Sequence, residues 1–284
     1  MKMFADCIPC FMNQALTASR MATDDSSVHD RTLRMAAAAL AETDSTMTPP
    51  AMAQMIHRII RTESGVADPY AEVKERFNAF ALELYPELKR MVAESSDPFE
   101  TAVRLAIAGN IIDFGASNHL RDEAVTIAIR ESLQCDLDHG TLTAMREEIA
   151  AAETILYLCD NTGEIVFDRV LIEELPLERV TAVVRGAPII NDATMADAKN
   201  VGLTDLVRVI DNGTDAPGTI LKQCDAELRS LFDAADVIIA KGQGNYETLS
   251  DVPRPIYHVL RIKCPVIARD VGCDVGSSLV TLRA

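Results

Sequence analysis

Asp160 and Asn161 follow a short apolar run, and only Thr162 separates them from the turn residue Gly163. The run Ile155–Leu158 is typical of a buried strand, and Glu164 opens a second apolar segment with helical spacing. Open α/β sheets bind ligands where a strand ends before a helix, and the free N–H groups of the helix start favour an anion. Carboxylate and amide oxygens are hard ligands, so we expect a divalent cation and a phosphate here.

Polar residues also follow the second predicted strand. Asn191 or Asp192 is suited to cap the next helix, and Asp197 lies about one turn inside it. Asp197 is either a solvated helical residue or a third metal ligand, because a carboxylate facing the sheet edge is costly to bury without a cation.

A lysine and two glycines end the fourth predicted strand. Lys241 precedes Gly242 and Gly244, whose backbone can bring N–H groups close to an oxyanion. The lysine adds a point charge for a phosphate, and Arg261 and Lys263 are further candidate anion contacts. The spacing matches neither the Rossmann fingerprint nor the Walker motif. A cation site and a lysine at neighbouring strand ends predict phosphoryl chemistry.

Two other polar groupings have open interpretations. Cys7 and Cys10 form half of a zinc site or a redox pair, yet no second pair follows at the spacing that zinc fingers use. They are therefore either structural or a thiol site. Asn110 and Asp113 lie in a polar segment after an apolar helix, which is either a helix end or the wall of a cleft.

The first half of the chain predicts successive helices. Ser26 is a candidate cap, Pro49 opens the next helix, and Asp68 and Asp97 each precede a proline at a helix start. Pro86 is expected to end or kink its helix.

After residue 152, short apolar runs alternate with helical patterns, which predicts βα units on a mostly parallel sheet. We expect a Rossmann-like three-layer α/β/α domain at 121–284, with an all-helical N-terminal domain at 1–120 packed on it without a flexible linker. The predicted strands lie at 155–158, 179–185, 206–210, 237–240, 256–262 and 266–268.

Composition limits the classes of function. The 284 residues carry a formal charge of −16, which disfavours nucleic acid and anionic membranes as partners. No window has the apolar length of a spanning helix, and the N-terminus lacks a signal-peptide core, so we expect a cytoplasmic protein. Seven cysteines in largely apolar contexts fit reduced thiols. The sequence does not indicate an oligomeric state.

Several separated motifs, in order along nearly the whole chain, resemble those of one known family. They are Cys7-x-x-Cys10, the segment 109–115, Asp160-Asn161-x-Gly163-Glu164 with Asp168, Asn191-Asp192-x-Thr194-x-x-Asp197, and the segment 241–247. Together they resemble the damage-control phosphatases, formerly a numbered domain of unknown function, in their stand-alone microbial branch.

The resemblance implies a phosphatase that acts on small phosphometabolites such as sugar phosphates or damaged side products. It implies that Asp160, Asn161 and Asp197 bind the metal and that Lys241 contacts the substrate phosphate. The oxygen ligands favour Mg²⁺ or Mn²⁺, and Fe²⁺, Co²⁺ or Ni²⁺ can occupy such a site.

Further roles follow from the same motifs. The turns at Gly163, Glu164, Gly242 and Gly244 are expected to hold the phosphate. Additional catalytic or supporting roles fall to residues that otherwise cap helices or line the cleft, namely Asp192, Asn110, Asp113, Asp168 and Glu164.

Two functions from other classes compete. A Rossmann-like carboxyl methyltransferase would need a glycine fingerprint after the first strand, which is missing. A non-enzymatic metal or redox protein would use Cys7 and Cys10, with Cys135 as a further candidate.

Overall fold

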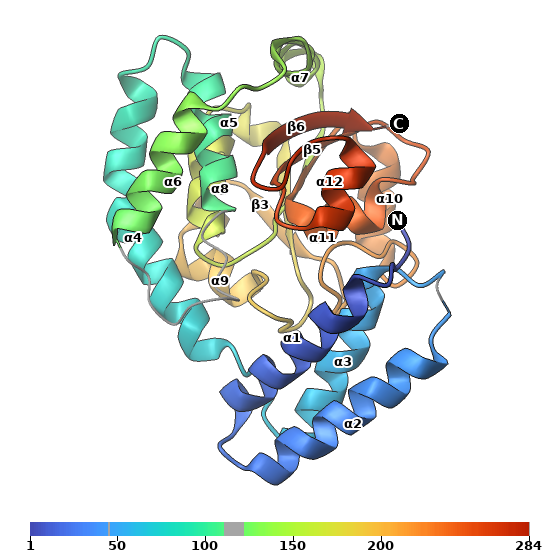
Figure 1. The fold of residues 1–284 in the computed structure, drawn as a ribbon. Coiled ribbons are helices and arrows are strands. Elements are labelled where there is room, and N and C mark those ends of the chain that lie inside the picture. The colour runs from blue at the N-terminus through green and yellow to red at the C-terminus, as the bar shows by residue number, and fades with distance from the viewer. Residues whose placement is uncertain (45, 111–121, 284) are drawn as a thin grey trace.

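The computed structural model describes residues 1–44, 46–110 and 122–283 (Figure 1). A six-stranded sheet with the order β3-β2-β1-β4-β5-β6 forms its centre. The first five strands are parallel, and β6 runs antiparallel to β5. This arrangement confirms the predicted mostly parallel α/β sheet. The strands are β1 (Ile155–Leu158), β2 (Val180–Val184), β3 (Arg208–Asp211), β4 (Val237–Lys241), β5 (Ile256–Arg261) and β6 (Ser278–Arg283).

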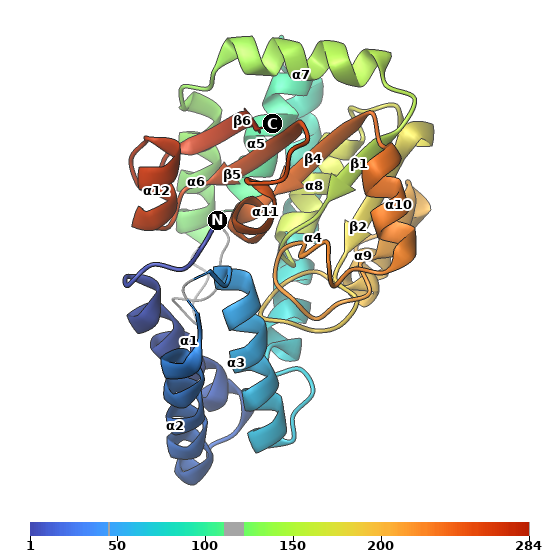
Figure 2. The same cartoon turned by 90° about the vertical axis from the view of Figure 1, so that its right-hand side faces the viewer.

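Helices cover both faces of the sheet because its central strands are apolar on both sides. In β1, Ile155 and Tyr157 belong to the core beneath α4 (Ala71–Ala93), α5 (Pro98–Gly109) and α8 (Glu164–Ile172), whereas Leu156 and Leu158 belong to the core beneath α10 (Ala226–Ala234). Figure 2 shows these layers, with α8 and α10 on opposite sides of the strands. The helices are α1 (Cys7–Ala22), α2 (Ser26–Glu42), α3 (Pro49–Ser64), α4 (Ala71–Ala93), α5 (Pro98–Gly109), α6 (Asp122–Gln134), α7 (His139–Ala151), α8 (Glu164–Ile172), α9 (Met195–Asn200), α10 (Ala226–Ala234), α11 (Gly242–Leu249) and α12 (Pro265–Val271), with 3₁₀ turns at Leu177–Arg179 and Leu203–Asp205.

Most predicted helix starts are confirmed, with three local corrections. Helix α4 begins at Ala71, and Tyr70 rather than Asp68 stands at its N-cap position. Asp25 rather than Ser26 caps α2, since its carboxylate accepts the N–H of Ser27 at 2.8 Å. The helix α4 continues past Pro86 to Ala93. Of the two predicted effects of this proline, the end of the helix is therefore wrong, and the kink stays a prediction.

The N-terminal helices divide into two packing groups. Helices α1, α2 and α3 form a bundle whose core includes Phe11 and Met52 and reaches Tyr246 of α11 and Ile267 of α12. Helices α4 and α5 instead share the core of the sheet. The predicted domain boundary at 120 falls within the undescribed segment 111–121 and stays a prediction. In the parts of the chain that the structure describes, no helix combines the length and apolarity needed to span a bilayer.

The last predicted strand, at 266–268, is wrong, since these residues lie in helix α12. A run of three apolar residues cannot distinguish a strand from a helix, and Pro265 at the first helical position favours the helix. The sixth strand is Ser278–Arg283 instead.

Candidate active site

A cavity of about 470 Å³ is lined by residues at the carboxyl ends of the strands and by residues of α1 and α3. It brings together residues that are far apart in the sequence, as the predicted position at strand ends requires. The predicted site residues among those lining it are Cys7, Cys10, Asn110, Asp160, Asn161, Asp192, Gly244 and Lys263.

Asp160 and Asn161 are held by amide hydrogen bonds at the turn between β1 and α8. The Nδ2 group of Asn161 donates to Asp160 Oδ2 at 2.8 Å and to Glu164 Oε2 at 3.0 Å. The Nδ2 group of Asn110 donates to Glu164 Oε2 at 2.8 Å. The side-chain amide hydrogens of Asn161 are thus used within the protein, and its Oδ1 is the hard oxygen that it can offer to a cation.

Asp192 is the carboxylate that joins this pair in the cavity wall. A backbone bridge links Asn161 to Asp192, and the N–H of Ala193 donates to the carbonyl of Asp160 at 2.8 Å. Backbone contacts therefore join the loops after β1 and β2 beside the carboxylates of Asp160 and Asp192.

Arg185 connects the carboxylates of Asp160 and Asp192. No role for this residue was predicted from the sequence. Its Nε donates to Asp192 Oδ2 at 2.6 Å and its Nη2 to Asp160 Oδ1 at 3.3 Å. The side chain is 1% exposed, so it needs such partners. Its place at the end of an apolar strand, beside two acidic turns, was the available signal.

Burial, with the neighbouring carboxylates of Glu164 and Asp192, raises the pKa of Asp160 well above its ordinary value. Burial also raises the pKa of Asp192, although Arg185 opposes this shift. Both carboxyls are thus held in a site that favours protonation until a cation offsets their charge.

Asp197, a predicted metal ligand, has both of its carboxylate oxygens hydrogen-bonded within the protein. Its Oδ2 accepts the N–H and the hydroxyl of Thr194 at 2.9 and 2.7 Å, which makes a capping box at the start of α9. Its Oδ1 accepts from Asn78 at 2.9 Å, and Asn78 in turn accepts the N–H of Gly163 at 2.8 Å. Among the described residues, those lining the cavity do not include Asp197. The predicted cap at Asn191 or Asp192 is wrong, because Thr194 takes that position.

Lys241 lies beneath the cavity in a buried ion cluster. Its Nζ donates to Glu164 Oε1 at 2.8 Å, to Asp168 and to the carbonyl of Ala106. Tyr157 also donates to Asp168 at 2.8 Å, and Lys241, Glu164 and Asp168 are fully buried. Burial opposes the charge of Lys241, but the two carboxylates raise its pKa above the ordinary value. Burial raises the pKa of Asp168 to about 6 despite the lysine.

Gly242 allows α11 to begin directly against Asp160. Its φ is +74°, and a Cβ atom built on it would lie 1.7 Å from Asp160 Oδ2. We therefore expect Gly242→Ala to lower the free energy of unfolding by more than about 2 kcal/mol and to abolish activity, because the carboxylate must move. Urea unfolding measures the first effect, and an assay of the predicted phosphatase activity measures the second.

Gly65→Ala is the matched control, since Gly65 has φ +73° but nothing within 4 Å of the added Cβ. It should lose only about 1 kcal/mol, the cost of the left-handed conformation. Equal losses in both variants would show that the contact with Asp160 does not matter.

The remaining predicted site residues are three cysteines and Asp113. Cys7 is buried, Cys10 is exposed, and both line the cavity together with Cys264. Cys135 instead donates to the carbonyl of Ser132 at 3.1 Å. Asp113 lies outside the described residues. In residues 1–44, 46–110 and 122–283, no group of three or more His, Cys, Asp or Glu side chains is arranged to hold a metal ion.

The charge balance of the buried network nevertheless fits a divalent cation that also uses amide oxygen. Four carboxyl groups, those of Asp160, Glu164, Asp168 and Asp192, form ion pairs with two cations, Arg185 and Lys241. If all are ionised, two negative charges remain. Buried charges are normally paired or bind metals, so the donor set fits a hard divalent ion.

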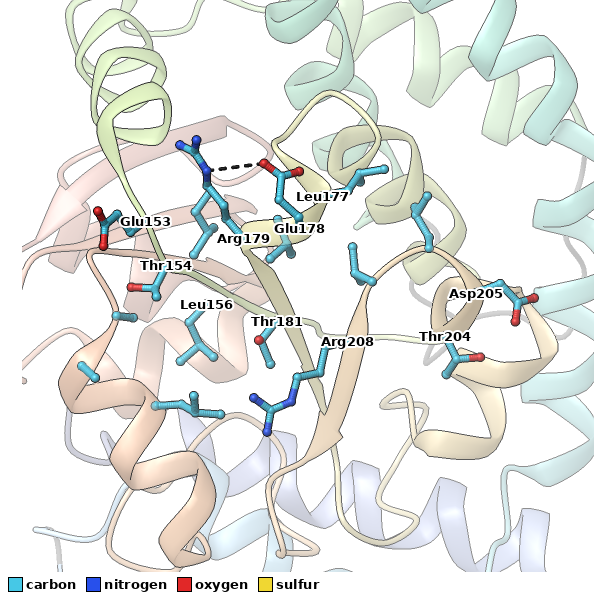
Figure 3. Close-up of a pocket in the computed structure, with 17 residues that line it drawn as sticks. Glu153, Thr154, Leu156, Leu177, Glu178, Arg179, Thr181, Thr204, Asp205 and Arg208 are labelled. Atoms are coloured by element: carbon cyan, nitrogen blue, oxygen red, sulfur yellow. Dashed lines mark ion pairs between the residues drawn. The ribbon is translucent and has the colours of Figure 1, made fainter.

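A second, larger cavity of about 810 Å³ lies at the opposite ends of β1, β2 and β3 (Figure 3). Its wall includes Leu156, Thr181 and Arg208, with an ion pair between Arg179 and Glu178 at 3.5 Å. Of the described site residues predicted from the sequence, this wall includes none. The predicted site residues that line a cavity are therefore those at the smaller cavity, at the carboxyl ends of the strands.

Comparisons with known proteins cover nearly the whole chain. The sequence model described as "Damage-control phosphatase ARMT1-like domain" matches residues 3–279. The chain is 39% identical to a damage-control phosphatase of Pyrococcus horikoshii, with 100% of this chain and 98% of the relative covered. It is 38% identical to a damage-control phosphatase of Archaeoglobus fulgidus, with 97% of each chain covered. The crystal structure of a DUF89 family protein from P. horikoshii superposes with a TM-score of 0.91, at 35% identity and 100% coverage of both chains.

Proposed function

Because this chain belongs to the damage-control phosphatase ARMT1-like domain family and is a phosphatase, we propose that it hydrolyses small phosphomonoesters with a divalent cation held by Asp160, Asn161 and Asp192. The substrates that we propose are sugar phosphates or damaged phosphorylated side products. The observation that supports this proposal is that these three residues line one cavity. In addition, Arg185 donates hydrogen bonds to both carboxylates, those of Asp160 and Asp192. The structure thus favours Asp192 over Asp197 as the third ligand in our proposal.

The protein's own residues orient the site. Asn110 and Asn161 hold the carboxylates of Asp160 and Glu164, and Arg185 keeps Asp160 and Asp192 together. A divalent cation, when bound, would act as a Lewis acid on the phosphoryl group.

Lys263 is the proposed contact for the substrate phosphate. It lines the cavity, and its charge opposes the rise that burial causes in the pKa of Asp160. Gly244, on the first turn of α11, lines the same cavity beside it. Lys241 was predicted from the sequence to contact the phosphate. In our proposal it instead supports the site through its ion pairs with Glu164 and Asp168.

Release of inorganic phosphate from a panel of sugar phosphates tests the proposal. Wild-type protein should be active with Mg²⁺, Mn²⁺ or Co²⁺ and inactive after chelation. Asp160→Ala should lose activity by about two to three orders of magnitude. Undiminished turnover in that variant, or in chelated protein, would contradict the site.

Metal affinity should fall as the pH is lowered. Asp160 and Asp192 have raised pKa values without a cation, so a bound cation must displace protons from them. The affinity should drop about tenfold per pH unit for each proton displaced, over the range in which the free carboxyls are protonated. Calorimetric Mn²⁺ titrations in two buffers of different ionisation enthalpy count the released protons. Binding that releases no protons and does not change with pH would contradict the assignment.

A further inference from the structure

The turn between β2 and α9 has an unusual backbone. Ile190 has φ +45°, and no other described residue apart from glycines has a positive φ. This conformation is strained for a β-branched residue, and such strain persists only where the surroundings enforce it. The side chain of Ile190 packs against the core of the α1–α3 bundle.

Asn191 directly follows Ile190 in this turn and lines the cavity. The carbonyl of Asn191 accepts the N–H of Thr162 at 2.9 Å and the hydroxyl of Thr162 at 3.1 Å. The residue is 4% exposed, and its Nδ2 is buried without a hydrogen-bond partner. A buried amide donor with no partner costs free energy, so its position calls for a reason other than stability.

A second amide without a partner reaches the same cavity from α1. Gln14 lies on the helix face with Cys7, Cys10 and Thr17, which all line the cavity. The Oε1 of Gln14 is buried and also lacks a hydrogen-bond partner. Two side chains that line this cavity, Asn191 and Gln14, thus each have an amide atom without a hydrogen-bond partner.

We infer that Asn191 and Gln14 bind hydroxyl groups on the alcohol part of the phosphoester. A hydroxyl group both accepts and donates a hydrogen bond, so it can satisfy Asn191 Nδ2 and Gln14 Oε1. The two amides then select alcohols that carry further hydroxyl groups over alcohols without them. This inference rests on the proposed phosphatase activity and adds specificity residues to it.

The test compares two phosphomonoesters with full-length protein and Mn²⁺. One is a hexose phosphate, and the other is p-nitrophenyl phosphate, whose leaving group has no further hydroxyl. The ratio of their kcat/KM values should fall about tenfold in Asn191→Ala and in Gln14→Ala, because each variant removes one hydrogen bond to the sugar. Asn200→Ala, an exposed residue at the end of α9, is the matched control and should leave the ratio unchanged.

Thermal unfolding separates binding from a structural role. Removal of a polar group without a partner should leave the melting temperature of Asn191→Ala equal or higher, whereas a structural role would lower it. An unchanged ratio in both variants, or a lower melting temperature with equal losses on both esters, would overturn the inference. If wild-type protein hydrolyses neither ester, the proposed phosphatase activity itself fails.

Discussion

Asp192→Asn should lower kcat/KM by about two to three orders of magnitude, whereas Asp197→Asn should keep activity within a few fold. Asp192 lines the cavity with Asp160 and Asn161 and shares Arg185 with Asp160. The amide replacement keeps the shape of the side chain but removes the charge that a cation needs. Phosphate release and calorimetric Mn²⁺ titration should both show the loss in Asp192→Asn.

Asp197→Asn is the matched variant because it makes the same chemical change five residues away. The carboxylate of Asp197 accepts from Thr194 and Asn78, so its loss weakens the start of α9. We expect a fall of about 1 kcal/mol in the free energy of unfolding, the usual contribution of a cap. If Asp197→Asn loses the metal and Asp192→Asn retains it, the ligand set implied by the family resemblance is correct instead.

Lys241→Met should lower the free energy of unfolding by about 3–5 kcal/mol, because it leaves Glu164 and Asp168 buried without their cation. The loss should be larger at pH 8 than at pH 5.5. Without the lysine the folded-state pKa of Asp168 rises further above its unfolded value, so the folded state binds the proton more tightly. Stability is then lost as pH rises through that range. Urea unfolding at the two pH values measures the effect.

The double variant Lys241→Met with Asp168→Asn should recover part of this stability, because it removes one of the unpaired charges. A phosphate contact at Lys241 would give another result. In that case KM would rise while the free energy of unfolding stayed close to that of wild type.

Much of the fold follows from local patterns in the sequence. Five of the six strands and most helix starts were predicted, because buried parallel strands are short apolar runs and helix starts carry caps and prolines. The antiparallel strand Ser278–Arg283 was missed because most of its residues are only partly buried, so its apolar pattern is weak.

The sequence by itself determined that Asp160, Asn161, Asp192 and Lys241 lie at the carboxyl ends of neighbouring parallel strands, since the order of elements fixes that edge. Only the tertiary structure decided which side chains line the cavity. Asp192 lies there after a turn in which Ile190 adopts a positive φ, which an isoleucine rarely does and no local pattern predicts. Asp197 and Lys241 instead satisfy buried partners from distant elements.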